Sequence, residues 1–269
     1  MNYIILDLEF NQFFGFPHTK MKPDLKCSSE IIQIGMVKLD ENLEITEPVE
    51  FFVRPQIYPR IHPYVRRITK ILANNLRQSP YFSDVFPLFA DYTEGKTVFC
   101  VWGCDDMREL YKNIMYHGLN ANLITKNYIN VQKLAAAHLK NPNSAVSLKQ
   151  AAETFGIETE RPFHTALSDA IYTAEILKVL IKEGYDLTQF IQRLDIGALK
   201  ESITAKVHSI NLKPFYEYAE SRFGRTLDPT ERAALIAVYN SGRVRRFDTN
   251  KGKPTTSIEE GEKNAENTI

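Results

Sequence analysis

The segment near the N-terminus reads Tyr3-Ile4-Ile5-Leu6-Asp7-Leu8-Glu9-Phe10, an apolar run interrupted by only two acids. Such a run predicts a buried β-strand. Side chains alternate between the two faces of a strand, so Asp7 and Glu9 point to the same face. Burying one isolated carboxylate costs several kcal/mol, and two adjacent ones need a compensating cation. An all-oxygen site suits magnesium or manganese. A solvated polar face of the strand is the alternative.

The strand and helix signals that follow predict an α/β fold with a mixed β-sheet flanked by helices. Further strands are expected at 31–39, 49–53, 96–102 and 128–131, and helices at 81–92, 106–116, 147–155 and 165–182. The connection over 11–29 carries Phe13, Phe14 and Phe16 and is long for a compact domain. Such a connection is typical of a functional or mobile loop.

The C-terminal part of the chain has a different composition, helical in character beyond Gly184. Asp228-Pro229-Thr230-Glu231 has the cap, the first-turn proline and the glutamate of a capping-box-like helix start. Residues 254–269 are polar and acidic, which predicts disorder. We therefore expect three parts: an α/β domain over 1–185, a helical extension over 186–249 and a disordered tail over 250–269.

A second group of candidate site residues consists of His164 and Asp169, at the start of the helix expected at 165–182. Five residues on a helix rotate by about 140°, so the two side chains face one site only if His164 precedes the helix. Thr165 or Ser168 is then placed to cap the helix. His164 would act as a proton acceptor beside a fixed carboxylate. A surface histidine before an ordinary helix-start aspartate is the alternative.

A third group follows the buried strand expected at 96–102, where Cys104-Asp105-Asp106 reaches the carboxyl edge of the sheet. In open α/β sheets, ligands bind at this edge. One of the two acids is expected to cap the next helix, and the other is then available to the site. Taken singly, each acid is better explained as a helix cap than as a site residue.

The overall composition places limits on partners and location. Lys plus Arg equal Asp plus Glu at 33 each, so any contact with nucleic acid depends on local basic patches. Cys27, Cys100 and Cys104 lack the paired spacing of a zinc site and are expected to be reduced. Asp7 lies too close to the first residue for the apolar region of a signal peptide. No apolar run approaches the roughly 20 residues that span a bilayer. We expect a cytoplasmic protein with no membrane partner; no pattern indicates an oligomeric state.

The order of the three groups resembles the DEDD exonucleases of the ribonuclease H-like superfamily, in particular the histidine-containing DEDDh subclass with its proofreading subunits and ribonuclease T. Asp7-Leu8-Glu9-Phe10 resembles the first motif, Trp102-Gly103-Cys104-Asp105-Asp106 the second, and His164 with Asp169 the third. The segment 29–35 is similar to the second strand of that family. Trp102-Gly103 resembles the pair found before the second-motif acid in the branch that contains the enhancer-of-RNA-interference exonucleases.

This resemblance implies a ribonuclease H-like fold and a two-metal mechanism with Mg²⁺ or Mn²⁺. It implies that Asp7 bridges both ions, that Glu9 and Asp169 each complete one coordination sphere, and that Asp106 holds a metal. It further implies that His164 deprotonates the attacking water. Two ions about 3.5–4 Å apart activate the nucleophile and stabilise the leaving 3′ oxygen, which explains why four carboxylates surround one spot.

One segment departs from the family pattern. Where the family has Thr-Gly-Ile, this chain reads Thr69-Lys70-Ile71 and lacks the glycine. The neighbouring Arg60, Arg66, Arg67 and Lys70 form a basic cluster without acids, suited to phosphates. The expected substrate-binding residues are Phe10, Arg66, Arg67, Thr69 and Lys70. Ordinary solvated cations and core aromatic residues are the alternatives.

The resemblance covers roughly residues 1–185 and implies a metal-dependent 3′-to-5′ exonuclease. Its partner would be nucleic acid with a free 3′ end, and the sequence allows both RNA and single-stranded DNA. The main alternative is a catalytically idle nucleic-acid-binding module on the same fold, since fold does not determine function.

Overall fold

The computed structural model describes residues 2–14, 24, 26–140, 146–209, 213–232, 235, 247–248 and 253–254. The helices and strands, in chain order, are β1 (Asn2–Gln12), β2 (Ser29–Leu39), β3 (Ile45–Phe52), α1 (Pro63–Thr69), α2 (Ala73–Arg77), α3 (Phe82–Tyr92), β4 (Thr97–Val101), α4 (Asp105–Tyr116), β5 (Asn127–Asn130), α5 (Val131–His138), α6 (Leu148–Thr154), α7 (Ala166–Lys182), η1 (Leu187–Phe190), β6 (Gln192–Arg193), α8 (Ile196–Ser209), α9 (Lys213–Phe223), β7 (Phe247–Asp248) and β8 (Lys253–Pro254). Two compact units are distinguished, Met1–Phe14 with Asp24–Ala205, and Gly15–Pro23 with Lys206–Ile269.

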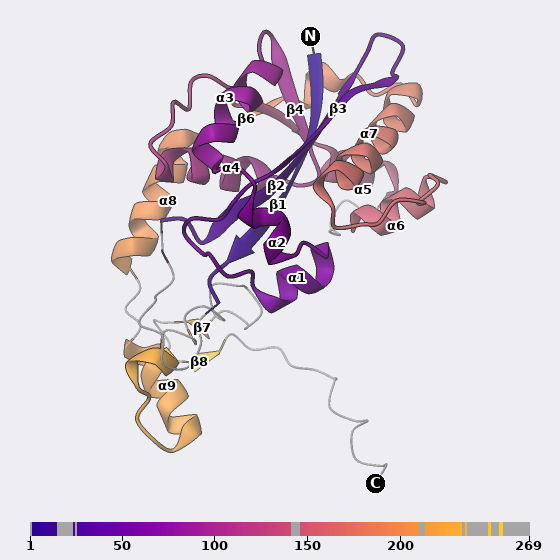
Figure 1. The fold of residues 1–269 in the computed structure, drawn as a ribbon. Coiled ribbons are helices and arrows are strands. Elements are labelled where there is room, and N and C mark those ends of the chain that lie inside the picture. Colours follow the sequence, from indigo (N-terminus) through magenta and orange to yellow (C-terminus); the bar gives the residue numbers. More distant parts are fainter. Residues whose placement is uncertain are drawn as a thin grey trace. The chain divides into compact units, whose positions relative to one another are not determined.

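The first unit is built on a six-stranded mixed sheet in the order β3-β2-β1-β4-β5-β6 (Figure 1). Strands β1, β2 and β3 pair antiparallel, β4 and β5 run parallel to β1, and β6 pairs antiparallel with β5. This arrangement confirms the predicted mixed sheet flanked by helices and the predicted strands around it. Strand β3 begins at Ile45, earlier than predicted, because Ile45 still pairs with Leu39 of β2.

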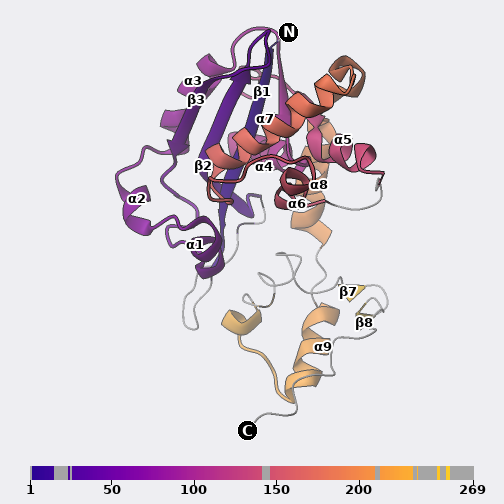
Figure 2. The ribbon, with the colours of Figure 1, turned by 90° about the vertical axis from the view of Figure 1, so that its right-hand side faces the viewer.

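The two faces of the sheet are covered by different helices, as Figures 1 and 2 show from two sides. Ile4, Leu6 and Leu8 of β1 pack in one apolar cluster with residues of α3 and α4. Ile5, on the opposite face, packs in a second cluster with residues of α5, α6 and α7. Since Asp7 and Glu9 alternate with Leu6 and Leu8, they belong to the face that α7 covers.

Helix α7 lies unusually close to β2 because of one glycine. A Cβ atom built on Gly35 would lie 2.1 Å from the carbonyl carbon of Ala166, a distance that no side chain tolerates. Gly35 is also the partner of Asp7 in the β1–β2 ladder. The start of α7 is therefore brought against the sheet beside Asp7.

The elements predicted from the sequence do not include helices α1, α2 and α5. Helix α1 starts with Pro63, and the Nδ1 atom of His62 accepts a hydrogen bond from the Tyr64 amide at 3.1 Å. Helix α5 starts where the Asn130 side chain accepts from the Lys133 amide at 3.0 Å. A histidine and an asparagine serve as the caps here, and both helices are too short for a clear periodic pattern.

Residues beyond 185 belong to both units. Strand β6 pairs with β5, and Leu194 and Leu199 join the α3–α4 cluster of the first unit. In the second unit, the Asp228 carboxylate accepts hydrogen bonds from the amides of Thr230 at 2.7 Å and Glu231 at 2.9 Å. The Glu231 carboxylate accepts in return from the Asp228 amide at 3.0 Å, which completes the predicted capping box.

The rest of the helix predicted after Asp228 lies largely outside the described residues, as does the predicted tail 250–269 apart from β8. The division into 1–185, 186–249 and 250–269 stays a prediction. Among the residues that the structure describes, no helix combines the length and the apolar content needed to cross a membrane.

Candidate active site

The site forms where β1 extends past its parallel neighbour. Strand β4 pairs with β1 only from Asn2 to Ile5, and β4 ends at Val101. Asp7 and Glu9 therefore lie beyond the end of β4. Helix α4 starts directly after β4, and its Asp106 reaches the Leu8 amide of β1 between these two acids.

The structure separates the two neighbouring acids of α4. The Asp105 side chain is 88% exposed and lies 3.6 Å from the Arg108 guanidinium. Asp106 is buried, and its carboxylate accepts a hydrogen bond from the Leu8 amide of β1. The prediction that one of them is the N-cap is wrong, because Cys104 occupies that position. Both acids lie in the first turn, where the helix dipole favours negative charge.

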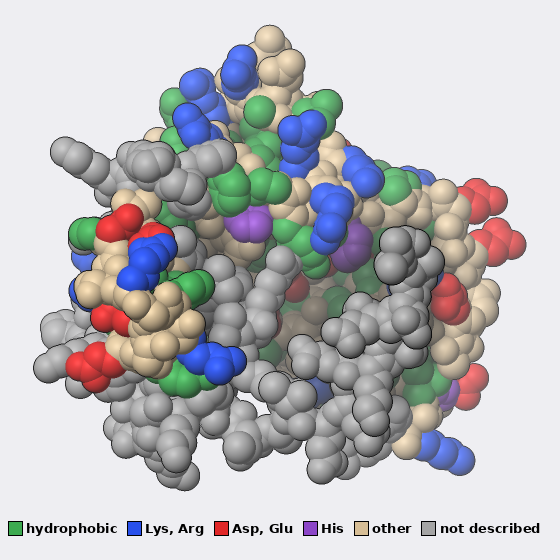
Figure 3. Space-filling model, turned by 90° about the horizontal axis from the view of Figure 1, so that it is seen from below, with side chains coloured by type: hydrophobic (Ala, Val, Ile, Leu, Met, Phe, Trp, Pro, Cys, Tyr) green, Lys and Arg blue, Asp and Glu red, His purple; other side chains and the backbone are tan. Residues whose placement is uncertain are grey.

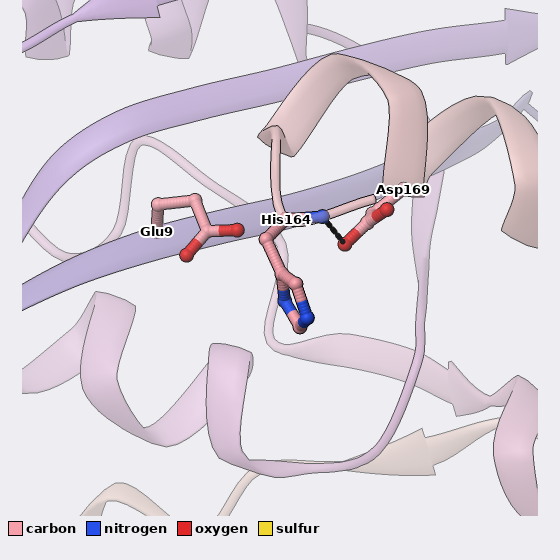
Figure 4. A group of neighbouring side chains, drawn as sticks. All are labelled: Glu9, His164 and Asp169. Atoms are coloured by element: carbon pink, nitrogen blue, oxygen red, sulfur yellow. Dashed lines mark hydrogen bonds between the residues drawn. The ribbon is translucent and has the colours of Figure 1, made fainter. Parts of the chain in front are cut away.

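His164 precedes α7, as predicted, and its backbone has the left-handed conformation with φ of 64°. This conformation is uncommon for residues other than glycine and concentrates at functional sites. The His164 amide donates to Oδ2 of Asp169 at 3.1 Å, so the carboxylate holds the turn in place (Figure 4). The histidine side chain is exposed, whereas Asp169 is 8% exposed.

The cap of α7 differs from the prediction. Thr165 is the N-cap residue, but its hydroxyl lies 2.7 Å from the Ser168 hydroxyl and makes no capping bond to the backbone. The Ala166 amide donates instead to Oε1 of Gln33 at 3.1 Å. A side chain from β2, distant in sequence, thus replaces the local cap.

Glu9, His164 and Asp169 form a group whose potential ligand atoms all lie within 4.8 Å of one another. Figure 4 shows Glu9 reaching in from β1, with Asp169 on the first turn of α7 on the other side of His164. The two elements are neighbours because Gly35 allows α7 to approach the sheet. The two carboxylates and the histidine are therefore close enough to act on one bound cation and its ligands.

The four carboxylates disfavour one another's charge. Burial raises the pKa of Glu9 to about 8, and the charges of Asp169 and Asp106 add to the rise. Burial also raises the pKa of Asp106 to about 8. The charge of Asp105 raises this pKa further, and the hydrogen bond from the Leu8 amide lowers it. The pKa of Asp169 rises with burial to about 6, against the hydrogen bond from His164.

Asp7 lies at the centre of this set. Burial raises its pKa well above the usual range, and the charges of Asp106, Asp169 and Glu9 then raise it further, in that order. Each of the three neighbours therefore acts on Asp7. Close carboxylates of this kind are stable in the charged form only when a cation neutralises them.

The donor set fits a hard divalent cation. Oδ2 of Asp169 is bonded to the His164 amide, but Oδ1 is buried and has no hydrogen-bond partner among the described residues. Buried polar atoms without a partner are rare and costly. Carboxylate oxygens that converge in this way suit magnesium or manganese.

Gln33 and Gly35 are site residues that sequence reasoning did not identify. Gln33 is 2% exposed; its Oε1 atom accepts from Ala166, and its Nε2 atom donates to Glu50 at 2.9 Å. Both residues lie on one face of β2, two positions apart, and this face meets α7. The segment 29–35 contributed to the prediction only through its likeness to a family strand, and the alternation of polar Gln33 with small Gly35 was the available signal.

The expected substrate-binding residues lie on α1 and at the end of β1. Phe10 packs, half-buried, against the α3–α4 cluster. Thr69 is 3% exposed; its hydroxyl donates to the Val65 carbonyl at 2.9 Å and accepts from the Ile71 amide at 3.1 Å. Thr69 thus stabilises the end of α1.

Lys70 follows as the C-cap of α1, with φ of 60°. This is the left-handed conformation that glycine adopts most easily, so the lysine keeps it at a cost of about 1–2 kcal/mol. Arg66, Arg67 and Lys70 are exposed, and together with Ile61, Pro63 and Leu72 they line a hollow of about 510 Å³.

Comparison with known proteins finds one matching family and many solved structures with a similar fold. The family model described as "Exonuclease" matches residues 4–177. A 3′-exonuclease structure described as recognising a histone mRNA stem-loop has 20% identity, covers 72% of this chain and 91% of its own, and has a TM-score of 0.59. The nuclease domain of 3′hExo, a DEDDh family member bound to rAMP, has 24% identity, coverages of 68% and 92%, and a TM-score of 0.59.

A third structure is that of S. pombe Pop2p in a Mg²⁺- and Mn²⁺-bound form, with 18% identity, coverages of 71% and 88%, and a TM-score of 0.55. At these identities the likenesses show the fold alone. No curated protein matches the sequence.

Proposed function

Since this chain belongs to the exonuclease family, we propose that it removes nucleotides one at a time from the 3′ end of RNA or single-stranded DNA. The observation that carries the proposal is the convergence of Glu9, His164 and Asp169 within 4.8 Å, next to Asp7 and Asp106. The family match over 4–177 includes all five residues. A binding module without activity would have no need to keep so many costly buried acids.

Asp7, Glu9, Asp106 and Asp169 would hold two divalent cations, Mg²⁺ or Mn²⁺. When bound, such cations neutralise phosphate charge and make water more acidic. His164 accepts a proton from the attacking water while the water oxygen forms a bond to phosphorus. The bond from phosphorus to the 3′ oxygen of the preceding nucleotide breaks, this oxygen takes up a proton from water, and a 5′-mononucleotide is released.

The exposure of His164 supports this role. Its ring is accessible, whereas its backbone is fixed by Asp169 through the bond from the amide. A proton acceptor needs access to water and a defined position, and this arrangement supplies both. The relatives described as bound to rAMP and as recognising an mRNA stem-loop are consistent with a nucleic-acid substrate.

The test follows a 5′-labelled oligonucleotide in the presence of Mg²⁺ or Mn²⁺. We expect a ladder of products that shortens stepwise from the 3′ end, and no cleavage of a strand whose last linkage is inverted to remove the 3′ end. Equal cleavage of both strands would indicate an endonuclease. Binding without any cleavage in either metal would support the idle module instead.

The proposed location is the cytoplasm. Cys27 and Cys100 are buried free thiols, and Cys104 is a partly buried one. Free thiols suit a reducing compartment. Fractionation of cells that express the tagged chain would test this, and recovery in an oxidising compartment would contradict it.

A further inference from the structure

A basic hollow of about 670 Å³ lies beside α1 and α2, apart from the carboxylate site. Four arginines line it: Arg54 after β3, Arg60 before α1, Arg66 in α1 and Arg77 at the end of α2. None of the described residues that line this hollow is acidic. We call it the arginine hollow.

The arginine hollow continues into the smaller hollow on α1. The two share Ile61 and Arg66, and the smaller one adds Arg67 and Lys70, again without an acid among its described lining residues. Figure 3 shows Lys and Arg side chains gathered on the described surface at this end of the molecule. The chain has no net charge, so such a one-sign surface is a local feature.

The guanidinium of Arg54 contacts an aromatic ring. It lies over the Tyr81 ring, 5.2 Å from the ring centroid. Arg54 and Tyr81 also form an isolated β-bridge, and the Arg54 amide donates to the Pro80 carbonyl at 2.8 Å. A guanidinium over an aromatic ring keeps its other N–H groups available for an anionic partner such as phosphate.

The wall of the arginine hollow is rigid because two buried side chains fix its backbone. The Glu30 carboxylate accepts hydrogen bonds from the amides of Gln56, Ile57 at 2.8 Å and Tyr58 at 2.7 Å. Asn11 binds the segment from the other side, since its amide group donates to the carbonyls of Tyr58 at 2.8 Å and Arg60 at 2.9 Å. The position of Arg60 is therefore set by β1.

Asn11 also connects the hollow to the carboxylate site. It lies two residues after Glu9 on β1, a distance of about 7 Å along a strand. Its side-chain oxygen accepts a hydrogen bond from the His62 amide at 2.9 Å, directly before α1, which carries Arg66 into the lining of the hollow. A strand bound with its end at Glu9 would thus pass within a few nucleotides of these arginines.

We propose that the arginine hollow binds the phosphodiester backbone of the same strand whose 3′ end lies in the carboxylate site. This inference rests on the proposed function. A polynucleotide fits better than a small anion because the two hollows together present six cations over more than one phosphate-sized space. Phosphate contacts by arginine position a strand and carry no sequence preference.

The test measures binding separately from cleavage. An Asp7→Asn background prevents hydrolysis, and fluorescence anisotropy then measures the affinity for an unstructured strand of about 12 nucleotides and for a dinucleotide. The variant is Arg54→Gln with Arg77→Gln. The matched control is Lys126→Gln with Arg193→Gln, which removes the same charge beside β5 and in β6, at the opposite edge of the sheet from β3.

We expect the arginine variant to lose roughly tenfold in affinity for the long strand and much less for the dinucleotide. Its salt dependence should become shallower, by about 0.7 in log–log slope for each phosphate of a single strand that the variant no longer binds. The control should match the parent on both strands. Circular dichroism melts verify that both variants fold.

The outcomes distinguish the two proposals. Equal affinities of the arginine variant and the control for the long strand overturn the arginine hollow, whatever the nuclease assay shows. Loss of long-strand affinity in the Asp7→Asn background, together with no cleavage by the protein that keeps Asp7, supports the hollow and overturns the exonuclease proposal. Equal losses for the long strand and the dinucleotide also overturn the inference, since the arginines would then act at the terminal nucleotide.

Discussion

The carboxylate site and the arginine hollow differ in how their charges are held. In the first, acids converge from β1, α4 and α7 into a buried space and raise one another's pKa values. In the second, arginines stand on exposed positions of a rigid surface and stay apart. Buried like charges need a specific partner in a specific place, whereas exposed like charges attract any polyanion. The comparison therefore distinguishes the proposed catalytic site from a surface proposed to position the substrate strand.

The largest effect should come from the centre of the buried site. Asp7→Ala should lower turnover by at least about 10⁴-fold, because Asp7 interacts with all three other carboxylates. Turnover of a labelled oligonucleotide measures this. The control is Asp105→Asn, an exposed acid beside Asp106, which should stay within about threefold of the parent. A matching loss in both variants would mean that bulk negative charge, not position, matters.

Loss of His164 should have the next largest effect. His164→Asn should lower turnover by about 10²–10⁴-fold, the usual range for a general base, while cation binding is kept. Asparagine accepts the left-handed backbone better than alanine, and the bond to Asp169 comes from the amide, so the turn should persist. Oligonucleotide turnover measures the loss of activity, and a Mn²⁺ titration measures cation binding. An active His164→Asn variant would show that the histidine is structural.

A smaller effect should come from the residue that positions α7. Gln33→Ala removes the acceptor of the Ala166 amide and should lower apparent cation affinity by about 10-fold, with the Asp169 carboxylate less well placed. Raised Mn²⁺ should restore most of the turnover. Glu50→Gln, which changes only the outer partner of Gln33, is the control and should have a weaker effect. A Gln33 variant with reduced turnover at every Mn²⁺ concentration would contradict a role in positioning.

The smallest effect is on stability. Because the folded pKa values of Glu9 and Asp106, at about 8, and of Asp169, at about 6, exceed ordinary values, the folded protein holds protons that the unfolded chain releases. Stability without cation should thus be greatest near the ordinary carboxyl pKa of about 4 and fall as the pH rises from there to about 8.

In chelator at about pH 8, Asp7→Asn should melt roughly 3–8 °C above the parent, since one buried charge is removed. The difference should shrink as the pH is lowered toward about 4, and addition of Mg²⁺ should remove it. Differential scanning calorimetry measures it, with Asp105→Asn as a control of equal charge change. A parent that is more stable at pH 8 than at pH 5 in chelator would contradict mutual repulsion at the site.

Much of the site could be predicted because its acids lie at strong local signals. Asp7 and Glu9 interrupt an apolar strand, and His164 precedes a clear helix pattern. The structure brings these three near Asp106 and Asp169. The choice between Asp105 and Asp106 depended on the family register alone, because the two acids are adjacent and only the direction of the helix turns one inward.

The cap of α7 could not be predicted, and of the arginine hollow only Arg60 and Arg66 were part of the predicted basic cluster, since the other parts are distant in the sequence. Gln33 reaches Ala166 across 133 positions. Arg54 and Arg77 come together only because α2 folds back beside the end of β3, where Glu30 and Asn11 fix the connecting backbone from buried positions. No periodicity records such contacts.

Local patterns in the sequence were sufficient for the strands and helices of the sheet domain, the two carboxylates on one face of β1 and the position of His164 before α7. These features follow from side-chain alternation and helical geometry, which act over a few residues. Three others arise from packing between distant segments: Asp106 faces Asp7, Gly35 admits α7 against the sheet, and four scattered arginines share one hollow. In each case a glycine or a few buried side chains position one element against another, and their effect appears only when the elements meet.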